Sequence, residues 1–145
     1  MTDHPILHPS VARSLGIWHT MVASRDLSAL RSITHPDAIF RSPVAFTAYR
    51  GADALVLAIG TVIQVFQDFT YHRTAVTGDG LNVVLEFSAS VEGKALKGID
   101  FIRFDEEGRI LEFEVMVRPL NGLQALALEM GRRVGQEISA FKAVP

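Results

Sequence analysis

Apolar side chains recur at helical spacing through the first half of the chain. Pro9 and Ser10 can open a helix whose apolar face would consist of Val11, Leu15, Trp18 and Val22. A short second helix with Leu27, Leu30 and Ile33 is expected next. Asp26 would cap that helix, and the sequence His35-Pro36-Asp37 would stop it. Residues 38–42 are then predicted to form a short strand.

Two further helices are expected on either side of the strand-rich region. Gly51 precedes a helix with Asp53 near its first turn, where negative charge is favourable. Its buried face would carry Leu55, Ile59, Val62 and Phe66. After Pro119 and Asn121, a final helix would present a long apolar seam made of Leu123, Leu126, Met130, Val134, Ile138 and Phe141. This seam fits three placements: over a pocket, across a subunit interface, or packed locally.

From residue 71 onward, the hydrophobic period becomes that of strands. Four strands are expected at 71–77, 81–91, 95–104 and 109–118, separated by short turns that contain glycine and acidic residues. Such short turns imply an antiparallel meander. Its apolar face would carry Leu85, Phe87, Ala89, Leu111, Phe113, Val115 and Val117. Helices followed by a meander predict an α+β fold, with the helices on one face of a curved sheet.

Length and composition fit a single domain. The 145 residues are 48% hydrophobic and 21% charged, and no linker divides them. A domain of this size buries roughly 68–70% of its unfolded surface, so a full core is possible without covalent staples. Residues 1–8 are expected to be a flexible lead-in. The chain contains no cysteine, which excludes disulfides, thiolate chemistry and cysteine-based zinc sites.

Charge and hydropathy bear on partners and location. The net charge is −2 and no run of Lys or Arg occurs, which argues against binding to nucleic acid or to an anionic membrane. The N-terminus lacks the basic start and the apolar core of a secretory signal. The longest apolar stretch, 54–66, is shorter than the ~20 residues that span a bilayer. We therefore expect a cytoplasmic protein.

Asp100 is the most informative single residue. It interrupts the stretch from Gly98 to Phe104, which otherwise suggests a strand packed on both faces. An ionised carboxylate is so costly to bury that it pairs or shifts its pKa until it is neutral. Asp100 is therefore either a pocket carboxyl available for acid–base chemistry, or a structural residue satisfied by the backbone or by a neighbouring Arg or Lys.

Other catalytic patterns are absent. The five histidines, at positions 4, 8, 19, 35 and 72, do not form the zinc-protease pattern, and neither a glycine-rich phosphate loop nor a nucleophilic serine elbow occurs. We expect no metal and no cofactor. The hydroxyl of Ser42 would by default end a strand. The apolar strand face would either fill a core or line a cavity.

Three segments nevertheless resemble a known superfamily. They are Phe40-Arg41-Ser42-Pro43, Tyr49-Arg50-Gly51 and the stretch from Gly98 to Ile110. Together with the order of elements, they resemble the nuclear transport factor 2-like superfamily over roughly residues 12–120. The SnoaL-like polyketide cyclases and the ketosteroid isomerases look closest. The resemblance implies a cone-shaped α+β fold in which a curved, mainly antiparallel sheet and its helices enclose a pocket.

The resemblance also assigns site residues. In ketosteroid isomerases, a protonated Asp at the position of Asp100 stabilises an oxyanion together with a Tyr. Here the position of that Tyr holds Trp18, and the position of the proton-abstracting Asp holds Ser42. An indole N–H donates but does not titrate, and a Ser hydroxyl is not a competent base near neutral pH. Steroid isomerisation with the family's usual residues is therefore not expected. The implied pocket wall is Leu55, Ala58, Ile59, Val62, Leu85, Phe87, Ala89, Phe113, Val115 and Val117.

We therefore predict a protein that binds a small apolar, carbonyl-bearing molecule. Asp100 would supply cyclase-type or isomerase-type acid–base chemistry, and Trp18 would orient the carbonyl group. The alternative is a non-catalytic binding or assembly module of the same fold, which the loss of the base at Ser42 favours.

A homodimer is also predicted. Members of the superfamily commonly pair through the sheet face that would here carry Met116 and Arg118. Sedimentation at micromolar concentration should give about twice the 15.9 kDa mass of the chain. A species of single-chain mass would contradict the prediction.

Overall fold

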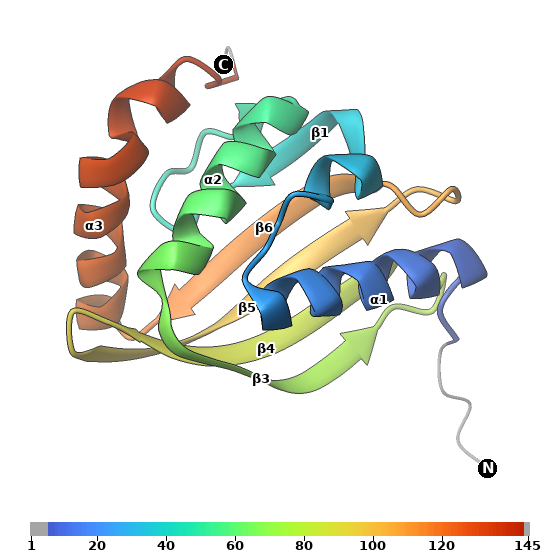
Figure 1. Ribbon diagram of the computed structural model, residues 1–145, viewed down its shortest axis with the longest axis horizontal. Helices are drawn as coiled ribbons and strands as arrows, with labels where there is room; N and C mark the ends of the chain where they lie inside the picture. Colours follow the sequence, from blue (N-terminus) through green and yellow to red (C-terminus); the bar gives the residue numbers. More distant parts are fainter. Residues whose placement is uncertain (1–5, 144–145) are drawn as a thin grey trace.

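The computed structural model describes residues 6–143, which form three α-helices, one short 3-10 helix and six strands (Figure 1). The helices are α1 (Pro9–Ser24), η1 (Leu30–Ile33), α2 (Ala52–Val65) and α3 (Leu120–Ser139). The strands are β1 (Thr34–Arg41), β2 (Tyr49–Arg50), β3 (Gln67–Val76), β4 (Asn82–Val91), β5 (Lys94–Phe104) and β6 (Ile110–Arg118). The predicted α+β class is confirmed.

The six strands form one open, mixed sheet in the order β2-β1-β6-β5-β4-β3. Strands β3 to β6 make the expected antiparallel meander. Strand β1 joins it in parallel with β6, and the two-residue β2 pairs with β1. Helices α1 and α2 lie against the same face of the sheet, and α3 runs beside α2 (Figure 1). Helix α1, α2 and the sheet thus surround a common interior.

The segment before β1 differs from the prediction. Only four residues, Leu30–Ile33, are helical, and the strand already begins at Thr34 and runs through Pro36. Proline has no N–H to give to a strand partner, so it is unusual inside a paired strand. Here the pairing of β1 with β6 is irregular between Thr34 and Ile39, so the missing donor is tolerated. Asp26 accepts a hydrogen bond from the backbone N–H of Ser28 in a local turn.

A bulge also corrects the predicted inward face of β6. Phe104 pairs with Ile110, but Arg103 pairs with Glu112, so Leu111 has no partner of its own. Ile110 is consequently fully buried, whereas Leu111 is only partly covered. Beyond the bulge the expected alternation holds, with Phe113 and Val115 buried and Met116 exposed.

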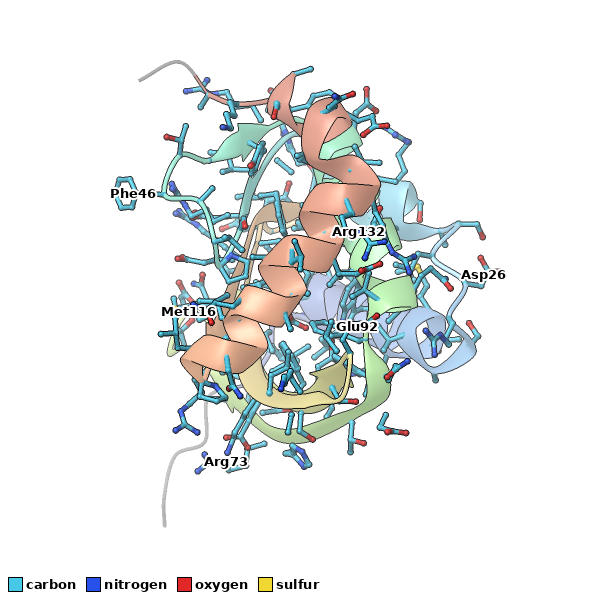
Figure 2. All side chains as sticks on the ribbon, turned by 90° about the vertical axis from the view of Figure 1, so that its left-hand side faces the viewer. Asp26, Phe46, Arg73, Glu92, Met116 and Arg132 are labelled. Carbon is cyan, nitrogen blue, oxygen red and sulfur yellow. The ribbon has the colours of Figure 1, made fainter. Side chains whose placement is uncertain are left out.

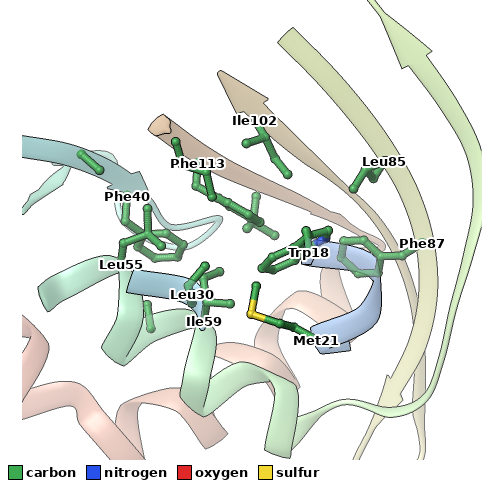
Figure 3. Close-up of a cluster of buried hydrophobic side chains, with 14 of the residues drawn as sticks. Trp18, Met21, Leu30, Phe40, Leu55, Ile59, Leu85, Phe87, Ile102 and Phe113 are labelled. Atoms are coloured by element: carbon green, nitrogen blue, oxygen red, sulfur yellow. The ribbon is translucent and has the colours of Figure 1, made fainter. Parts of the chain in front are cut away.

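The core lies between the helices and the inward face of the sheet. Figure 3 shows Trp18 of α1 and Ile59 of α2 facing Phe113 and Ile102 of the sheet. The largest side chains with almost no exposed surface are Phe87, Phe104, Phe113, Leu30, Leu55, Leu85, Ile102 and Ile110. All the predicted seam residues, from Leu123 to Phe141, are at least partly buried, although α3 ends at Ser139 and Phe141 follows it. Apart from Leu111 at the bulge, the helical and strand periods identified the buried faces correctly.

Met116 is 43% exposed on the outer side of the sheet, and Phe46, in the loop between β1 and β2, is 100% exposed (Figure 2). The homodimer through this side stays a prediction. Between residues 6 and 143, no helix has both the length and the apolar character needed to cross a membrane.

Gly98 allows β5 to lie close to its neighbours. A Cβ at Gly98 would stand 2.7 Å from Cζ of Phe87 and would also clash with the backbone oxygen of Met116. We expect Gly98→Ala to lower the free energy of unfolding by about 1–3 kcal/mol, as overpacked cores do. Urea denaturation measures this change.

Gly60→Ala is the matched control, because a Cβ at Gly60, inside α2, meets nothing within 4 Å. It should stabilise the protein by about 0.5–1 kcal/mol through reduced backbone entropy of the unfolded chain. Equal effects of the two substitutions would refute the packing argument.

Candidate functional site

Three side chains form a hydrogen-bonded chain in the interior. The indole Nε1 of Trp18 donates to the hydroxyl of Tyr71 at 3.0 Å. The hydroxyl of Tyr71 donates in turn to Oδ2 of Asp100 at 2.6 Å. Trp18 is 3% exposed and Asp100 is 6% exposed. The chain thus joins α1, β3 and β5 at a buried carboxyl.

The strand register explains why Asp100 points inward. Asp100 pairs with Leu85 on one side and with Val115 on the other, and both of these residues are buried. Because side chains alternate along a strand, Asp100 shares the inward face with Gly98 and Ile102. The carboxyl therefore faces the helices and not the outer surface.

Aromatic neighbours hold the ring of Tyr71. Its ring lies edge-to-face with Phe69, 4.8 Å between centroids, and with Phe87, 6.5 Å. His19 of α1 packs edge-on to the same ring at 5.4 Å. Such edge-to-face contacts are a preferred arrangement of aromatic pairs. The phenol is therefore positioned by packing as well as by its hydrogen bonds.

Burial controls the protonation of Asp100. Desolvation raises the pKa of its carboxyl from 3.8 to about 7, and the hydrogen bond from Tyr71 opposes only part of this rise. The pKa of Tyr71 is raised well above 10, first by burial and then by the charge of Asp100. Asp100 is consequently the member of the chain that gains and loses a proton near neutral pH.

The second carboxyl oxygen of Asp100 is free. Oδ1 has no hydrogen-bond partner among residues 6–143, although every fully enclosed side-chain oxygen or nitrogen of these residues has one. Asp100 lines a cavity of about 230 Å³, so Oδ1 is open to that cavity. The carboxyl thus holds one oxygen fixed and presents the other.

The cavity lies between the sheet and all three α-helices, and the loop after β1 also borders it. Eight of the predicted site residues line its wall: Trp18, Ser42, Ala58, Ile59, Val62, Asp100, Phe113 and Val115. Five others do not reach it: Leu55, Leu85, Phe87, Ala89 and Val117. Phe87, for example, is covered by Phe66 and Phe69, whose ring centroids lie 5.4 Å and 5.0 Å from its own.

Helix α3 covers the cavity. Leu126, Met130, Val134 and Ile138 of its apolar seam line the wall. Of the three placements that the sequence left open, the seam thus adopts the one over the pocket. The seam was visible in the sequence, but its target was not, because periodicity identifies a buried face without saying what it faces.

Tyr71 was not recognised as a site residue. The predicted strand began at Tyr71, whereas β3 begins at Gln67. With the earlier start, Phe69 and Tyr71 form an alternating aromatic pair, and both line the cavity. That pair is the signal that could have identified the phenol.

The roles expected for Trp18 and Ser42 also change. The single N–H of the Trp18 indole is directed at Tyr71, which leaves the indole no second donor for a ligand carbonyl. The hydroxyl oxygen of Ser42 accepts a hydrogen bond from the backbone N–H of Val44 at 3.1 Å. Among the described residues, 6–143, no three His, Asp or Glu side chains gather as metal ligands would.

Comparison with known proteins identifies the family to which this chain belongs. A sequence model of the SnoaL-like domain matches residues 17–113. The chain belongs to the SnoaL-like domain family. Its resemblance to the nuclear transport factor 2-like superfamily is thereby confirmed. Among curated proteins, no relative was found.

Solved structures agree with this assignment. A crystal structure of a steroid delta-isomerase from Pseudomonas aeruginosa is 52% identical, with a TM-score of 0.89, and the match covers 94% of this chain and 99% of that one. An uncharacterised protein with a cystatin-like fold from Silicibacter pomeroyi is 32% identical, with a TM-score of 0.78 and 92% of each chain covered.

A candidate SnoaL-like polyketide cyclase from Jannaschia is 12% identical, with a TM-score of 0.66. That match covers 88% of this chain and 98% of that one, and it shows a shared fold. The SnoaL-like fold of this chain is thus found with both isomerase and cyclase neighbours.

The raised pKa of Asp100 predicts a specific dependence of stability on pH. Between about pH 4 and pH 7 the folded protein keeps a proton on Asp100 that the unfolded chain has lost. The free energy of unfolding should therefore fall as pH rises through this interval and level off above it. Relative to Asp100→Asn, which does not titrate, the loss should be roughly 1.4 kcal/mol for each pH unit.

Urea denaturation of both proteins from pH 4.5 to pH 8.5 measures this difference. Other groups titrate equally in the two proteins, so their contributions to the difference in stability cancel. This applies to His19, whose pKa is lowered by burial. A difference that stays constant with pH would show that Asp100 keeps an ordinary pKa.

Proposed function

We propose that the protein binds a small apolar ketone and that Asp100 moves a proton at the carbon next to the ketone carbonyl. One observation carries this proposal. A buried carboxyl with a pKa of about 7 is held through Oδ2 by Tyr71 and presents Oδ1 to an apolar cavity. A base with a pKa near the working pH is the most effective for proton transfer.

The wall of the cavity argues for an uncharged ligand. Among residues 6–143, no Lys, Arg or His side chain lines it, and the wall consists mainly of aliphatic and aromatic groups. A charged ligand would lose its hydration there without gaining an ion pair. The volume of about 230 Å³ lies below the roughly 300–1,000 Å³ of pockets for drug-sized ligands. A compact molecule of one or two rings therefore suits the cavity.

The proposed reaction begins with ionised Asp100. Oδ1 takes a proton from the carbon next to the carbonyl, so that the C–H bond breaks, an O–H bond forms, and the electron pair becomes an enolate. Protonated Asp100 is a weaker acceptor for the hydroxyl of Tyr71. The phenol then donates to the enolate oxygen, while the indole of Trp18 continues to donate to the phenol. Oδ1 finally returns its proton to a carbon of the enolate.

An enolate can lead to either an isomerisation or a cyclisation. An isomerase returns the proton to a different carbon, and a cyclase uses the enolate carbon to form a bond. The likeness to the Pseudomonas aeruginosa steroid delta-isomerase supports the first outcome. Ser42 at the position of the isomerases' base leaves Asp100 as the carboxyl that would act, so the same group would both take and return the proton.

Exchange of hydrogen for deuterium tests the first step without a known substrate. The probe is 2-tetralone, a bicyclic ketone with acidic protons next to its carbonyl, incubated with the protein in D₂O and followed by NMR. The wild-type protein should accelerate exchange, and Asp100→Asn should reduce the acceleration at least about 100-fold. The wild-type rate should rise with pH and reach half of its maximum near pH 7.

Binding of 2-tetralone, measured by calorimetry on the same proteins, separates the alternatives. Asp100→Asn should bind the ketone but not exchange its protons. Wild-type protein that binds 2-tetralone with exchange at the background rate would overturn the catalytic proposal and favour a non-catalytic binding module. His19→Gln is the control for pH, because His19 contacts Tyr71 but not the carboxyl. The midpoint should not move in this variant.

A further inference from the structure

The cavity has a second polar end, at Tyr49 of β2. Tyr49 lines the cavity and is 7% exposed. It pairs with Phe40 of β1, and Phe40 pairs with Phe113 of β6, so the three side chains share the inward face of the sheet. The rings of Phe40 and Tyr49 lie 6.3 Å apart. Strand pairing thus directs this tyrosine toward the same interior as Asp100.

The hydroxyl of Tyr49 has no protein partner. No side chain or backbone group within residues 6–143 forms a hydrogen bond with it, yet every fully enclosed side-chain oxygen of these residues is bonded. The oxygen is therefore not fully enclosed, and Tyr49 forms part of the cavity wall. Ser42 lies on the same wall, and its own O–H is free to donate because its oxygen only accepts from Val44.

A structural role does not explain this hydroxyl. A phenylalanine would pack against Phe40 equally well, and it would place no unpartnered hydroxyl among the largely buried side chains. The hydroxyl of Tyr71, in contrast, is bonded on both sides. The two tyrosines of the chain thus differ: the hydroxyl of Tyr71 is bonded to protein groups, and that of Tyr49 has no hydrogen-bond partner among residues 6–143.

The two polar ends are well separated. Tyr49 on β2 and Asp100 on β5 are three strand positions apart in the sheet order. At about 4.8 Å for each position, the two strands are about 14 Å apart across the sheet, and inward-pointing side chains shorten this gap. A rigid molecule that reaches both ends would need one oxygen at each end.

We propose that Tyr49 anchors a second oxygen of the ligand, so that the substrates are apolar ring compounds with a ketone at one end and a hydroxyl or carbonyl at the other. The proposal rests on the proposed function for the position of the ketone. Tyr49 acts as a specificity-determining residue: it selects and orients the substrate but takes no part in proton transfer.

Two matched ketones test the proposal. 6-Hydroxy-2-tetralone carries a hydroxyl at the far end of the frame, and 2-tetralone lacks it. Calorimetry with the wild-type protein should show about three- to tenfold tighter binding of the hydroxylated ketone. Tyr49→Phe should abolish this preference and leave the affinity for 2-tetralone unchanged. A preference that persists in Tyr49→Phe, or that is absent from the wild type, would overturn the proposal.

The other tyrosine provides the matched control. Tyr71→Phe removes a hydroxyl at the carbonyl end, so it should slow proton exchange of both ketones and preserve the preference for the hydroxylated one. Ser42→Ala should retain most of the preference, and its complete loss there would assign the anchor to Ser42 in place of Tyr49. Failure of the proposed function would give a different result. The wild-type protein would then not accelerate exchange of either ketone, but its preference for binding the hydroxylated ketone could still be measured.

Discussion

The burial of Asp100 without a cation is the constraint on which the site depends. Glu86, on the neighbouring strand β4, shows the contrast. Its carboxylate lies on the other face of the sheet, where hydrogen bonds from Arg73 and then Lys97 lower its pKa to about 2. Asp100 faces inward, receives one hydrogen bond from a neutral phenol, and has its pKa raised to about 7. The two faces of one sheet thus keep one carboxylate charged and let the other titrate.

The chain from Trp18 through Tyr71 makes this burial tolerable. An unpartnered buried carboxyl would cost several kcal/mol, and the phenol satisfies one of its oxygens while the indole satisfies the phenol. The three residues come from α1, β3 and β5, so the packing of these elements fixes the carboxyl. In the proposed reaction, a ligand would meet an oxygen whose direction is set before binding, which reduces the reorganisation that proton transfer requires.

Much of the fold followed from the sequence, because alternation and helical spacing report directly on which faces are buried. The inward position of Asp100 followed from its parity with Gly98 and Ile102. Tyr71 did not follow, because its strand begins four residues before the predicted start and its partner Asp100 is distant in sequence. Leu85 and Phe87 have the expected parity but lie behind other side chains. Parity assigns a face, whereas access to a cavity depends on packing between elements.

Two positions of the site depart from the isomerase pattern, and together they change which groups could move a proton. In that pattern the base and the oxyanion-stabilising acid are separate carboxyls, whereas here the base position holds Ser42 and the first-helix tyrosine position holds Trp18. The phenol is supplied instead by Tyr71, from the edge strand of the sheet. In the proposed reaction, a single carboxyl would therefore remove and return the proton in sequence at one oxygen. Such a site suits reactions in which a proton leaves and returns on one face of the ligand, and it does not suit reactions that need an acid and a base at the same moment.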